Sequence, residues 1–336
     1  MEYVNLGATG LKVSKFCLGV MSYGDATKGW NPWILPPSEG KVFLRQALEL
    51  GVNFFDVADV YAEGSSEEFL GQAIGELARR YEVVIATKVG SRVSAKRPQD
   101  LQGGWPTTHG LSRKHIFDAA DASLRRLKTD YIDLYQIHAD DLQTPIEETL
   151  EALHDLIKLG KVRYIGASNT AAWRLAKALY VADLRGATRF VSVQHHYNLI
   201  YREDERELLP LLKDEQVASM PWSPLARGFL AGNRSRRGET SERARSDPTA
   251  ANLYGSDSDY AVADRVAEVA RERGVGATQV ALAWLLARPC TTIPVIGATK
   301  PHHLPDAAAA VGLTLSSEEV GRLEAPYQSQ GVRSPI

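Results

Sequence analysis

Short apolar runs alternate with longer amphipathic segments along most of the chain. Eight runs have the β-branched and aromatic content of buried parallel strands. They lie near 15–20, 53–57, 83–87, 131–137, 162–167, 190–195, 217–222 and 292–296. The segments with the 3.6-residue apolar period of a helix lie near 38–50, 66–80, 112–127, 146–159, 170–184, 205–213, 260–287 and 301–310. Eight strand and helix pairs in one chain predict an α/β fold, the (β/α)8 TIM barrel.

Both ends of the chain add to this repeat. Near the start, the runs 4–6 and 11–13 flank a Gly-bearing turn at 7–10, a pattern that predicts a β-hairpin. A helical segment near 316–325 is additional to the eight pairs. Because no linker-like composition separates one set of pairs from another, we expect residues 1–336 to form a single barrel domain.

Composition argues against nucleic acid, metal and membrane partners. The formal net charge is −2, and the chain contains no Lys/Arg run long enough to follow a phosphate backbone, so we expect no nucleic acid partner. Cys17 and Cys290 are far apart in apolar segments and predict buried thiols in a reducing compartment, with no metal site. Neither a membrane-length apolar run nor a signal-peptide pattern is present, so we expect a cytoplasmic protein without membrane contact.

Three connections are too long to be simple turns, and each of them follows a predicted strand. They cover 22–37, 91–111 and 224–258. In a TIM barrel the loops after the strands line the catalytic face, so their aromatic residues predict an apolar substrate pocket. The expected pocket residues are Tyr23, Trp30, Trp33 and Trp105, together with His138. The same rings would equally serve to fix long loops to the barrel.

Three predicted strands end at titratable residues. Asp56 ends the second strand, Lys88 ends the third, and His138 follows the fourth, while Tyr61 comes five residues after Asp56. Parallel strands of one sheet would bring all four residues to the same rim. Each residue has an ordinary structural explanation when it is taken alone, but the combination favours proton-transfer chemistry.

A lysine beside a tyrosine can make the phenol a usable acid near neutral pH. Lowering the pKa of a phenol from about 10 to neutrality requires about 4 kcal/mol. An ammonium about 4 Å away, at an effective dielectric of about 20, supplies about 4 kcal/mol. We therefore expect Lys88 to lower the pKa of Tyr61, Asp56 to keep Lys88 charged, and His138 to bind the oxygen that Tyr61 protonates. An alkoxide forms when a hydride reaches a carbonyl, so this chemistry implies a nicotinamide cofactor.

The usual dinucleotide fingerprint is missing from the sequence. Gly274-Val275-Gly276 opens a predicted helix but follows another helix, so it does not match a Rossmann glycine motif. A barrel can instead bind phosphates at the loops after its seventh and eighth strands. Segments 223–228 and 297–300 occupy those places, although ordinary turn chemistry would explain their proline and glycines equally well.

The residues described so far resemble those of the aldo-keto reductase family, from the N-terminal hairpin to the last helix. Within that family the chain is most similar to the aryl-alcohol dehydrogenase-like branch and to potassium-channel β subunits. The resemblance implies an NADPH-dependent oxidoreductase that converts a small aldehyde or ketone to an alcohol. It implies that the catalytic residues are Asp56, Tyr61, Lys88 and His138.

The same resemblance implies a set of cofactor contacts. These are Met21, Asp56, Ser168, Asn169, Gln194, Trp222, Ser223, Leu225, Arg227, Gly228, Gly297, Thr299, Lys300 and His303. Trp222 takes the place of the aromatic ring that stacks on the nicotinamide, and Thr299 with Lys300 favours NADPH over NADH. His303 stands where a Gln is common, and Asp306-Ala307 stands where the family often has Glu-Asn, which are departures around the adenine.

Two other functions are compatible with the sequence. The similarity to channel subunits permits a cofactor-sensing module with little turnover. A barrel lyase in which Lys88 forms a Schiff base is the other alternative. It leaves Asp56, Tyr61 and the Ser168-Asn169 pair without a role.

Overall fold

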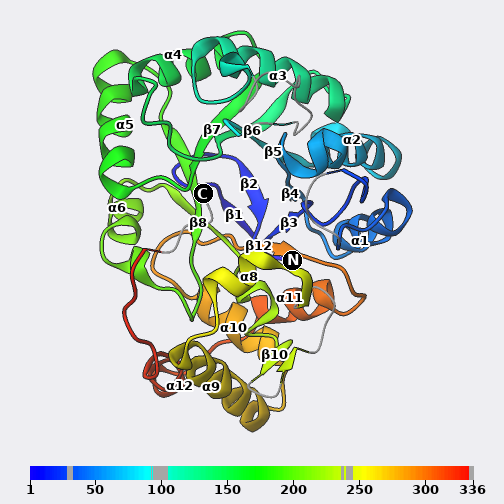
Figure 1. Ribbon diagram of the computed structural model, residues 1–336, viewed down its shortest axis with the longest axis vertical. Coiled ribbons are helices and arrows are strands. Elements are labelled where there is room, and N and C mark those ends of the chain that lie inside the picture. Colours follow the sequence, from blue (N-terminus) through cyan, green and yellow to red (C-terminus); the bar gives the residue numbers. More distant parts are fainter. Residues whose placement is uncertain (29–32, 92, 94–104, 236–237, 240–244, 333–336) are drawn as a thin grey trace.

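Eight parallel strands form the central sheet of the computed structural model (Figure 1). The structure describes residues 1–336 except 29–32, 92, 94–104, 236–237, 240–244 and 333–336. In spatial order the strands are β12 (Val295–Gly297), β3 (Cys17–Gly19), β4 (Phe54–Asp56), β5 (Val84–Val89), β6 (Ile132–Ile137), β7 (Val162–Ser168), β8 (Phe190–His196) and β9 (Ala218–Trp222). A bridge between Ser219 and Thr292 brings the two edges together. The predicted TIM barrel is confirmed, and every predicted strand overlaps an observed one.

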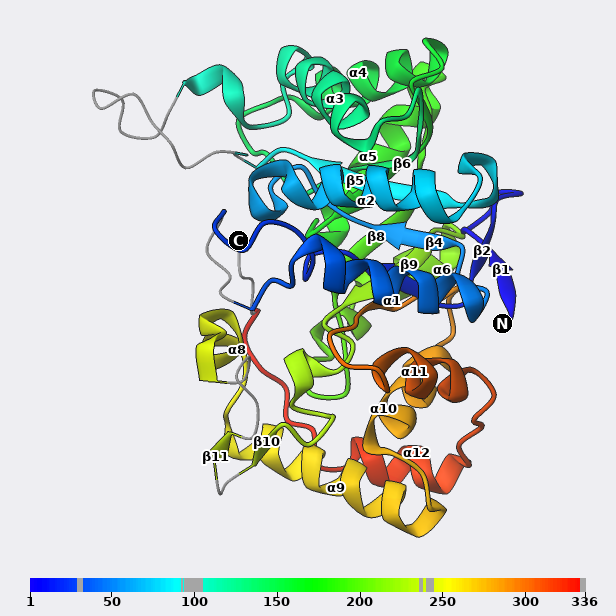
Figure 2. The same cartoon turned by 90° about the vertical axis from the view of Figure 1, so that its right-hand side faces the viewer.

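Helices surround the barrel (Figures 1 and 2). They are α1 (Pro37–Glu49), α2 (Ser65–Leu77), α3 (Arg113–Leu127), α4 (Ile146–Lys158), α5 (Ala172–Arg185), α6 (Leu208–Asp214), α8 (Pro248–Leu253), α9 (Asp257–Arg273), α10 (Ala277–Leu286), α11 (His303–Val311) and α12 (Ser317–Glu324). The helical segment predicted near 260–287 consists of two helices, which meet at the stretch Gly274-Val275-Gly276. Gly274 ends α9 in the left-handed conformation, with φ 66°, and α10 begins three residues later. In the described part of the chain, no helix is both long enough and apolar enough to span a membrane.

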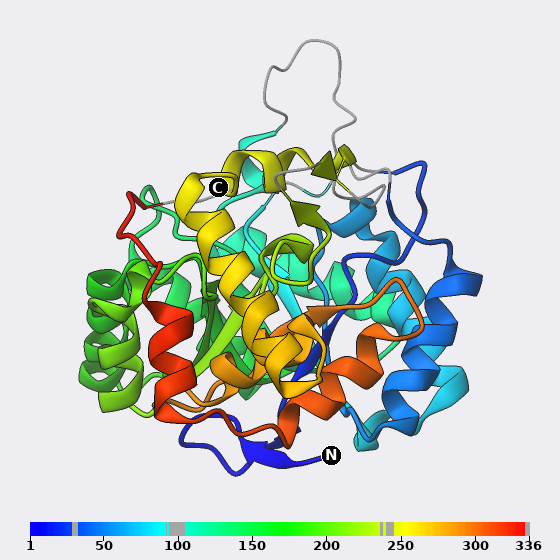
Figure 3. The ribbon, with the colours of Figure 1, turned by 90° about the horizontal axis from the view of Figure 1, so that it is seen from below.

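The predicted additions at both ends of the chain are present. Strands β1 (Tyr3–Asn5) and β2 (Lys12–Ser14) pair antiparallel and lie at the N-terminal end of the barrel, opposite α8 (Figures 2 and 3). The loop after β9 contains α8 and the short strands β10 (Arg234–Ser235) and β11 (Gly238–Glu239). Helix α12 begins with a capping box formed by Ser316 and Glu319, which satisfies backbone N–H groups of its first turn.

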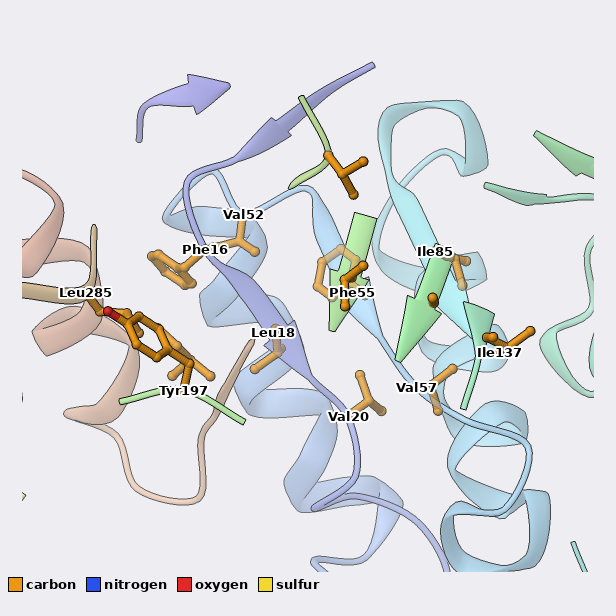
Figure 4. Packing of buried hydrophobic residues seen from close by; sticks show 14 of the residues in the cluster. Phe16, Leu18, Val20, Val52, Phe55, Val57, Ile85, Ile137, Tyr197 and Leu285 are labelled. Atoms are coloured by element: carbon orange, nitrogen blue, oxygen red, sulfur yellow. The ribbon is translucent and has the colours of Figure 1, made fainter. Parts of the chain in front are cut away.

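Alternation along the strands separates two apolar layers. The outer layer lies between barrel and helices, and Figure 4 shows part of it, with Leu18, Phe55 and Ile85 from three neighbouring strands. The inner layer contains Phe54 and Met220 among residues that fill the barrel interior beneath the rim. Because successive side chains point to opposite faces of a strand, consecutive residues of a strand belong to different layers.

The same alternation places polar residues at the rim end of the interior. On β5 the inward positions run from Val84 and Ala86 to Lys88, and on β4 from Phe54 to Asp56. The interior therefore changes from an apolar plug near the hairpin to a polar layer at the carboxyl ends of the strands. That end of a barrel is where TIM-barrel enzymes carry their active sites.

Candidate active site

Lys88 is the centre of a buried polar cluster at this rim. Its Nζ lies 2.6 Å from Asp56 Oδ2, 2.9 Å from the Val57 carbonyl oxygen and 3.2 Å from the Tyr61 hydroxyl. The side chains of Lys88 and Asp56 are 0% and 3% exposed. An ammonium has three N–H donors, and these three contacts use all of them. Lys88 thus contacts both the acid and the phenol that the sequence had placed beside it.

The charge on Lys88 is stabilised despite its burial. Burial is the largest single influence and would by itself lower the pKa of the Lys88 ammonium. The charge of Asp56 and the hydrogen bonds to Asp56 and Tyr61 together outweigh it, so the pKa of Lys88 is raised. The residue is therefore an ammonium at neutral pH.

The direction of the pKa shift at Tyr61 differs from the one expected. Burial, the largest influence, raises the pKa of Tyr61, and the nearby charge of Lys88 offsets this only in part. Asp56, which pairs with Lys88, also raises the pKa of Tyr61, because a phenolate next to the negative Asp56 carboxylate is unfavourable. The phenol is therefore protonated at neutral pH. Its oxygen accepts a hydrogen bond from Lys88, which leaves the hydroxyl proton available for donation.

Asp56 is held on both of its carboxylate oxygens. Oδ2 accepts from Lys88, while Oδ1 accepts from Gln194 Nε2 at 2.8 Å and from Gln136 Nε2 at 3.0 Å. Such donors compensate the loss of hydration that a buried ion pair suffers. Sequence reasoning missed Gln136. The available signal was a polar residue at an inward position of a strand, two residues before His138.

His138 faces Tyr61 at the same rim of the barrel. The two rings meet edge to face, with centroids 5.8 Å apart. Burial, and secondarily the charge of Lys88, lowers the pKa of His138 to about 3. The imidazole is therefore neutral and carries one N–H donor. Its Nδ1 is buried and has no hydrogen-bond partner among the described residues, so the ring is not committed to an internal contact on that side.

Asn169 links the neighbouring strand ends. Its Nδ2 donates to the His138 carbonyl oxygen at 2.9 Å and to Ser168 Oγ at 3.0 Å. Its Oδ1 accepts from Trp222 Nε1 at 2.9 Å, and its backbone is left-handed, with φ 49°. The structure therefore brings together Ser168, Asn169 and Trp222, which are three of the expected cofactor contacts. Both amide hydrogens of Asn169 are used inside the protein, which leaves only Oδ1 to accept from a ligand.

Trp222 is part of a stack of three rings. Its ring lies parallel to that of His196 with centroids 4.2 Å apart, and His196 stacks at the same distance on Tyr201. His196 Nε2 also lies 2.5 Å from the Tyr254 hydroxyl, which belongs to the loop after β9. The stack fixes the plane of Trp222 and connects it to that loop. Sequence reasoning had no signal for His196.

The loop after β9 has an unusual backbone. Ser223, Ala226 and Arg227 all have positive φ, between 48° and 53°, a conformation that costs a non-glycine residue about 1–2 kcal/mol. Leu225 has φ −104° and ψ 20° and precedes the left-handed Ala226, whose backbone N–H donates to the Ser223 carbonyl oxygen at 2.8 Å. Arg227 Nη1 is held by the buried Asp247 at 2.6 Å. Gly228, with φ 92°, completes the turn.

The remaining predicted cofactor residues lie at the adjoining strand ends. Gly297 ends β12, and the exposed Lys300 follows two residues after Ala298. The Thr299 backbone N–H donates to His303 Nδ1 at 3.2 Å, at the first residue of α11. The N-terminus of α11 therefore faces the segment expected to bind a phosphate. Met21 is half-buried in the turn that follows β3.

Two of the residues predicted for the aromatic pocket are buried in the core. Tyr23 is fully buried, donates to the Ala298 carbonyl oxygen at 2.6 Å and stacks on Phe43, so it is part of the core. Trp33 is also buried, while Trp105 is 59% exposed on the surface. Trp30 lies outside the described residues. For Tyr23 and Trp33, the alternative in which aromatic rings fix long loops to the barrel is the better description.

Comparison with known proteins agrees with this architecture. A model of the Aldo/keto reductase family matches residues 15–328. Versiconal hemiacetal acetate reductase of Aspergillus parasiticus is 40% identical over 344 residues, which cover 99% of this chain and 98% of that protein. A putative aryl-alcohol dehydrogenase of Saccharomyces cerevisiae is 36% identical over 349 residues, covering 99% of each chain. An aldo-keto reductase of Metarhizium robertsii is 41% identical over 350 residues, 99% of this chain and 93% of its own. With the family model spanning nearly the whole chain, this protein belongs to the aldo/keto reductase family.

Proposed function

We propose that the protein is an NADPH-dependent carbonyl reductase that converts aldehydes or ketones to alcohols, with Tyr61 as the proton donor. The observation that carries this proposal is the Lys88 ammonium, which is buried and bound to Asp56 on one side and to the Tyr61 hydroxyl on the other. The relatives whose names describe a reductase and an aryl-alcohol dehydrogenase support chemistry at a carbonyl or its alcohol.

The described residues perform the proton half of the reaction. NADPH, when bound, supplies the hydride. Tyr61 gives its hydroxyl proton to the carbonyl oxygen as negative charge develops there, and Lys88 stabilises the phenolate that remains. Neutral His138 donates a hydrogen bond to the same oxygen. The raised pKa of Tyr61 keeps this proton in place until the substrate oxygen becomes basic.

The residues present are suited to a nicotinamide dinucleotide. Trp222, whose plane is fixed by His196, offers a stacking surface for the nicotinamide ring. The guanidinium of Arg227, in the loop after β9, is complementary to a pyrophosphate. Lys300, next to the N-terminus of α11, provides the positive charge for the 2′-phosphate that distinguishes NADPH from NADH.

The geometry disfavours a Schiff-base lyase. Such a lysine must lose its proton and reach a carbonyl carbon, whereas Lys88 is fully buried, makes three hydrogen bonds and has a raised pKa. Chemistry that starts from a neutral Lys88 amine would have to break the ion pair with Asp56 first.

Turnover distinguishes a reductase from a cofactor sensor. The purified protein is mixed with NADPH and a panel of aromatic and aliphatic aldehydes and ketones, and loss of NADPH absorbance is followed. We expect steady, substrate-dependent oxidation of NADPH and a much higher Km for NADH. Tight binding of NADPH without oxidation by any member of the panel would contradict the proposal and favour a sensor.

A further inference from the structure

Gln136 occupies a central place in the barrel beside the proposed catalytic residues. On β6 it pairs in register with Lys88 of β5 on one side and with Gly166 of β7 on the other. Its side chain is fully buried, and its Nε2 donates to Asp56 Oδ1 at 3.0 Å. Because Asp56 is on β4, the amide of Gln136 reaches across β5 to make this contact.

The neighbouring strand leaves room for this side chain. A Cβ atom at position 166 would lie 3.1 Å from Gln136 Cγ and 2.7 Å from Ser192 Oγ. Gly166 does not have a positive φ, so backbone conformation does not require a glycine there. Its role is to provide space, and the extended chain of Gln136 occupies part of that space.

The amide of Gln136 does not favour the stability of the folded state. Its Oε1 is buried and has no hydrogen-bond partner among the residues that the structure describes. A buried amide with an unmet acceptor disfavours the folded state, whereas an unbranched apolar side chain of similar length would fill the same space without that penalty. What the glutamine adds is an N–H donor directed at Asp56.

That donor defines the orientation of the catalytic carboxylate. Gln136 and Gln194 both donate to Oδ1 of Asp56, which leaves Oδ2 turned towards Lys88. We propose that Gln136 is a positioning residue, which fixes the rotamer of Asp56 and thereby keeps the Lys88 ammonium on the Tyr61 hydroxyl. The effect on turnover rests on the proposed reductase function, whereas the effect on the geometry of Asp56 does not.

The test compares Gln136→Met with Tyr135→Phe. Tyr135 is the adjacent residue on the outer face of β6, and its hydroxyl is also buried without a partner among the described residues, so it is a matched control for removing an unsatisfied polar group. For Gln136→Met we expect a melting temperature within about 3 °C of wild type, because the lost hydrogen bond and the removed unsatisfied carbonyl offset each other. We expect kcat to fall about ten- to a hundredfold, with the NADPH dissociation constant unchanged.

Tyr135→Phe should keep the wild-type kcat. A Gln136→Met enzyme with wild-type kcat, or one whose activity falls only in proportion to a large loss of melting temperature, would overturn the positioning role while leaving the reductase function intact. If the wild-type protein reduces no carbonyl, the proposed function fails, and a crystal structure of Gln136→Met decides the inference instead. A rotated Asp56 with a lengthened Lys88 contact is expected, and an unchanged ion pair at 2.6 Å would overturn it.

Discussion

Replacing Lys88 with Met removes the charge next to the proposed proton donor. Nζ of Lys88 lies 3.2 Å from the Tyr61 hydroxyl oxygen. At an effective dielectric of about 20, a unit charge at that distance stabilises a phenolate by about 5 kcal/mol. The Asp56 carboxylate cancels part of this, so we take about 3 kcal/mol as the net stabilisation, which corresponds to about a hundredfold in rate.

The same substitution also affects the fold, because it leaves Asp56 buried with only two amide donors. Removing one member of a buried ion pair costs about 3–5 kcal/mol, or about 4–7 °C in melting temperature for a chain of this size. The double variant Asp56→Asn/Lys88→Met removes both charges and keeps an acceptor for the glutamines. It should recover most of the melting temperature but none of the rate.

The assay is aldehyde-dependent oxidation of NADPH under single-turnover conditions, with the cofactor bound before mixing. This arrangement separates the chemical step from cofactor binding. Melting curves on the same samples show what fraction of each variant is folded. A double variant that melts near wild type and transfers hydride within about threefold of the wild-type rate would refute the electrostatic role of Lys88.

Two further predictions concern Trp222 and His138. Trp222→Phe keeps an aromatic ring but loses the indole hydrogen bond to Asn169. We expect the NADPH dissociation constant, measured by fluorescence titration, to rise about two- to tenfold, and Asn169→Ala to add little in the double variant. Fully additive losses would mean that the two residues act separately. His138 has a folded-state pKa of about 3 against an ordinary 6.5, so below pH 6.5 the unfolded chain binds a proton that the folded protein does not. The free energy of unfolding should therefore fall as the pH drops from about 6.5 towards 3, by up to about 1.4 kcal/mol per pH unit. His138→Gln should show a shallower slope in urea titrations across that window, and an identical slope would contradict this assignment.

The fold could be predicted from the sequence because the two-residue period of a strand and the 3.6-residue period of a helix are both visible in short stretches of sequence. Inward and outward positions alternate within each strand, and Phe54 and Phe55 show this because they belong to the inner and the outer layer. Parallel strands then bring their carboxyl ends to one rim, so acids and bases at those ends could be expected to meet. Gly274 also indicated the break between α9 and α10, because glycine is typical of a helix end. The apolar period continues across this break.

The other features depend on three-dimensional surroundings that no local pattern encodes. Tyr23 lies in a loop with aromatic character, yet its hydroxyl binds the carbonyl oxygen of Ala298, 275 residues away. The pKa of Tyr61 depends on the balance between burial and the charge of Lys88, and the extent of burial cannot be read from spacing. The contact from Gln136 to Asp56 likewise depends on the space above Gly166.

The central claim is that the Tyr61 hydroxyl, held by Lys88, protonates the substrate oxygen during hydride transfer. Tyr61→Phe removes only that hydroxyl, so NADPH binding should persist while the single-turnover rate of aldehyde reduction falls by about a thousandfold or more. A Tyr61→Phe protein that binds NADPH normally and reduces the aldehyde within about tenfold of the wild-type rate would show that the proton comes from elsewhere.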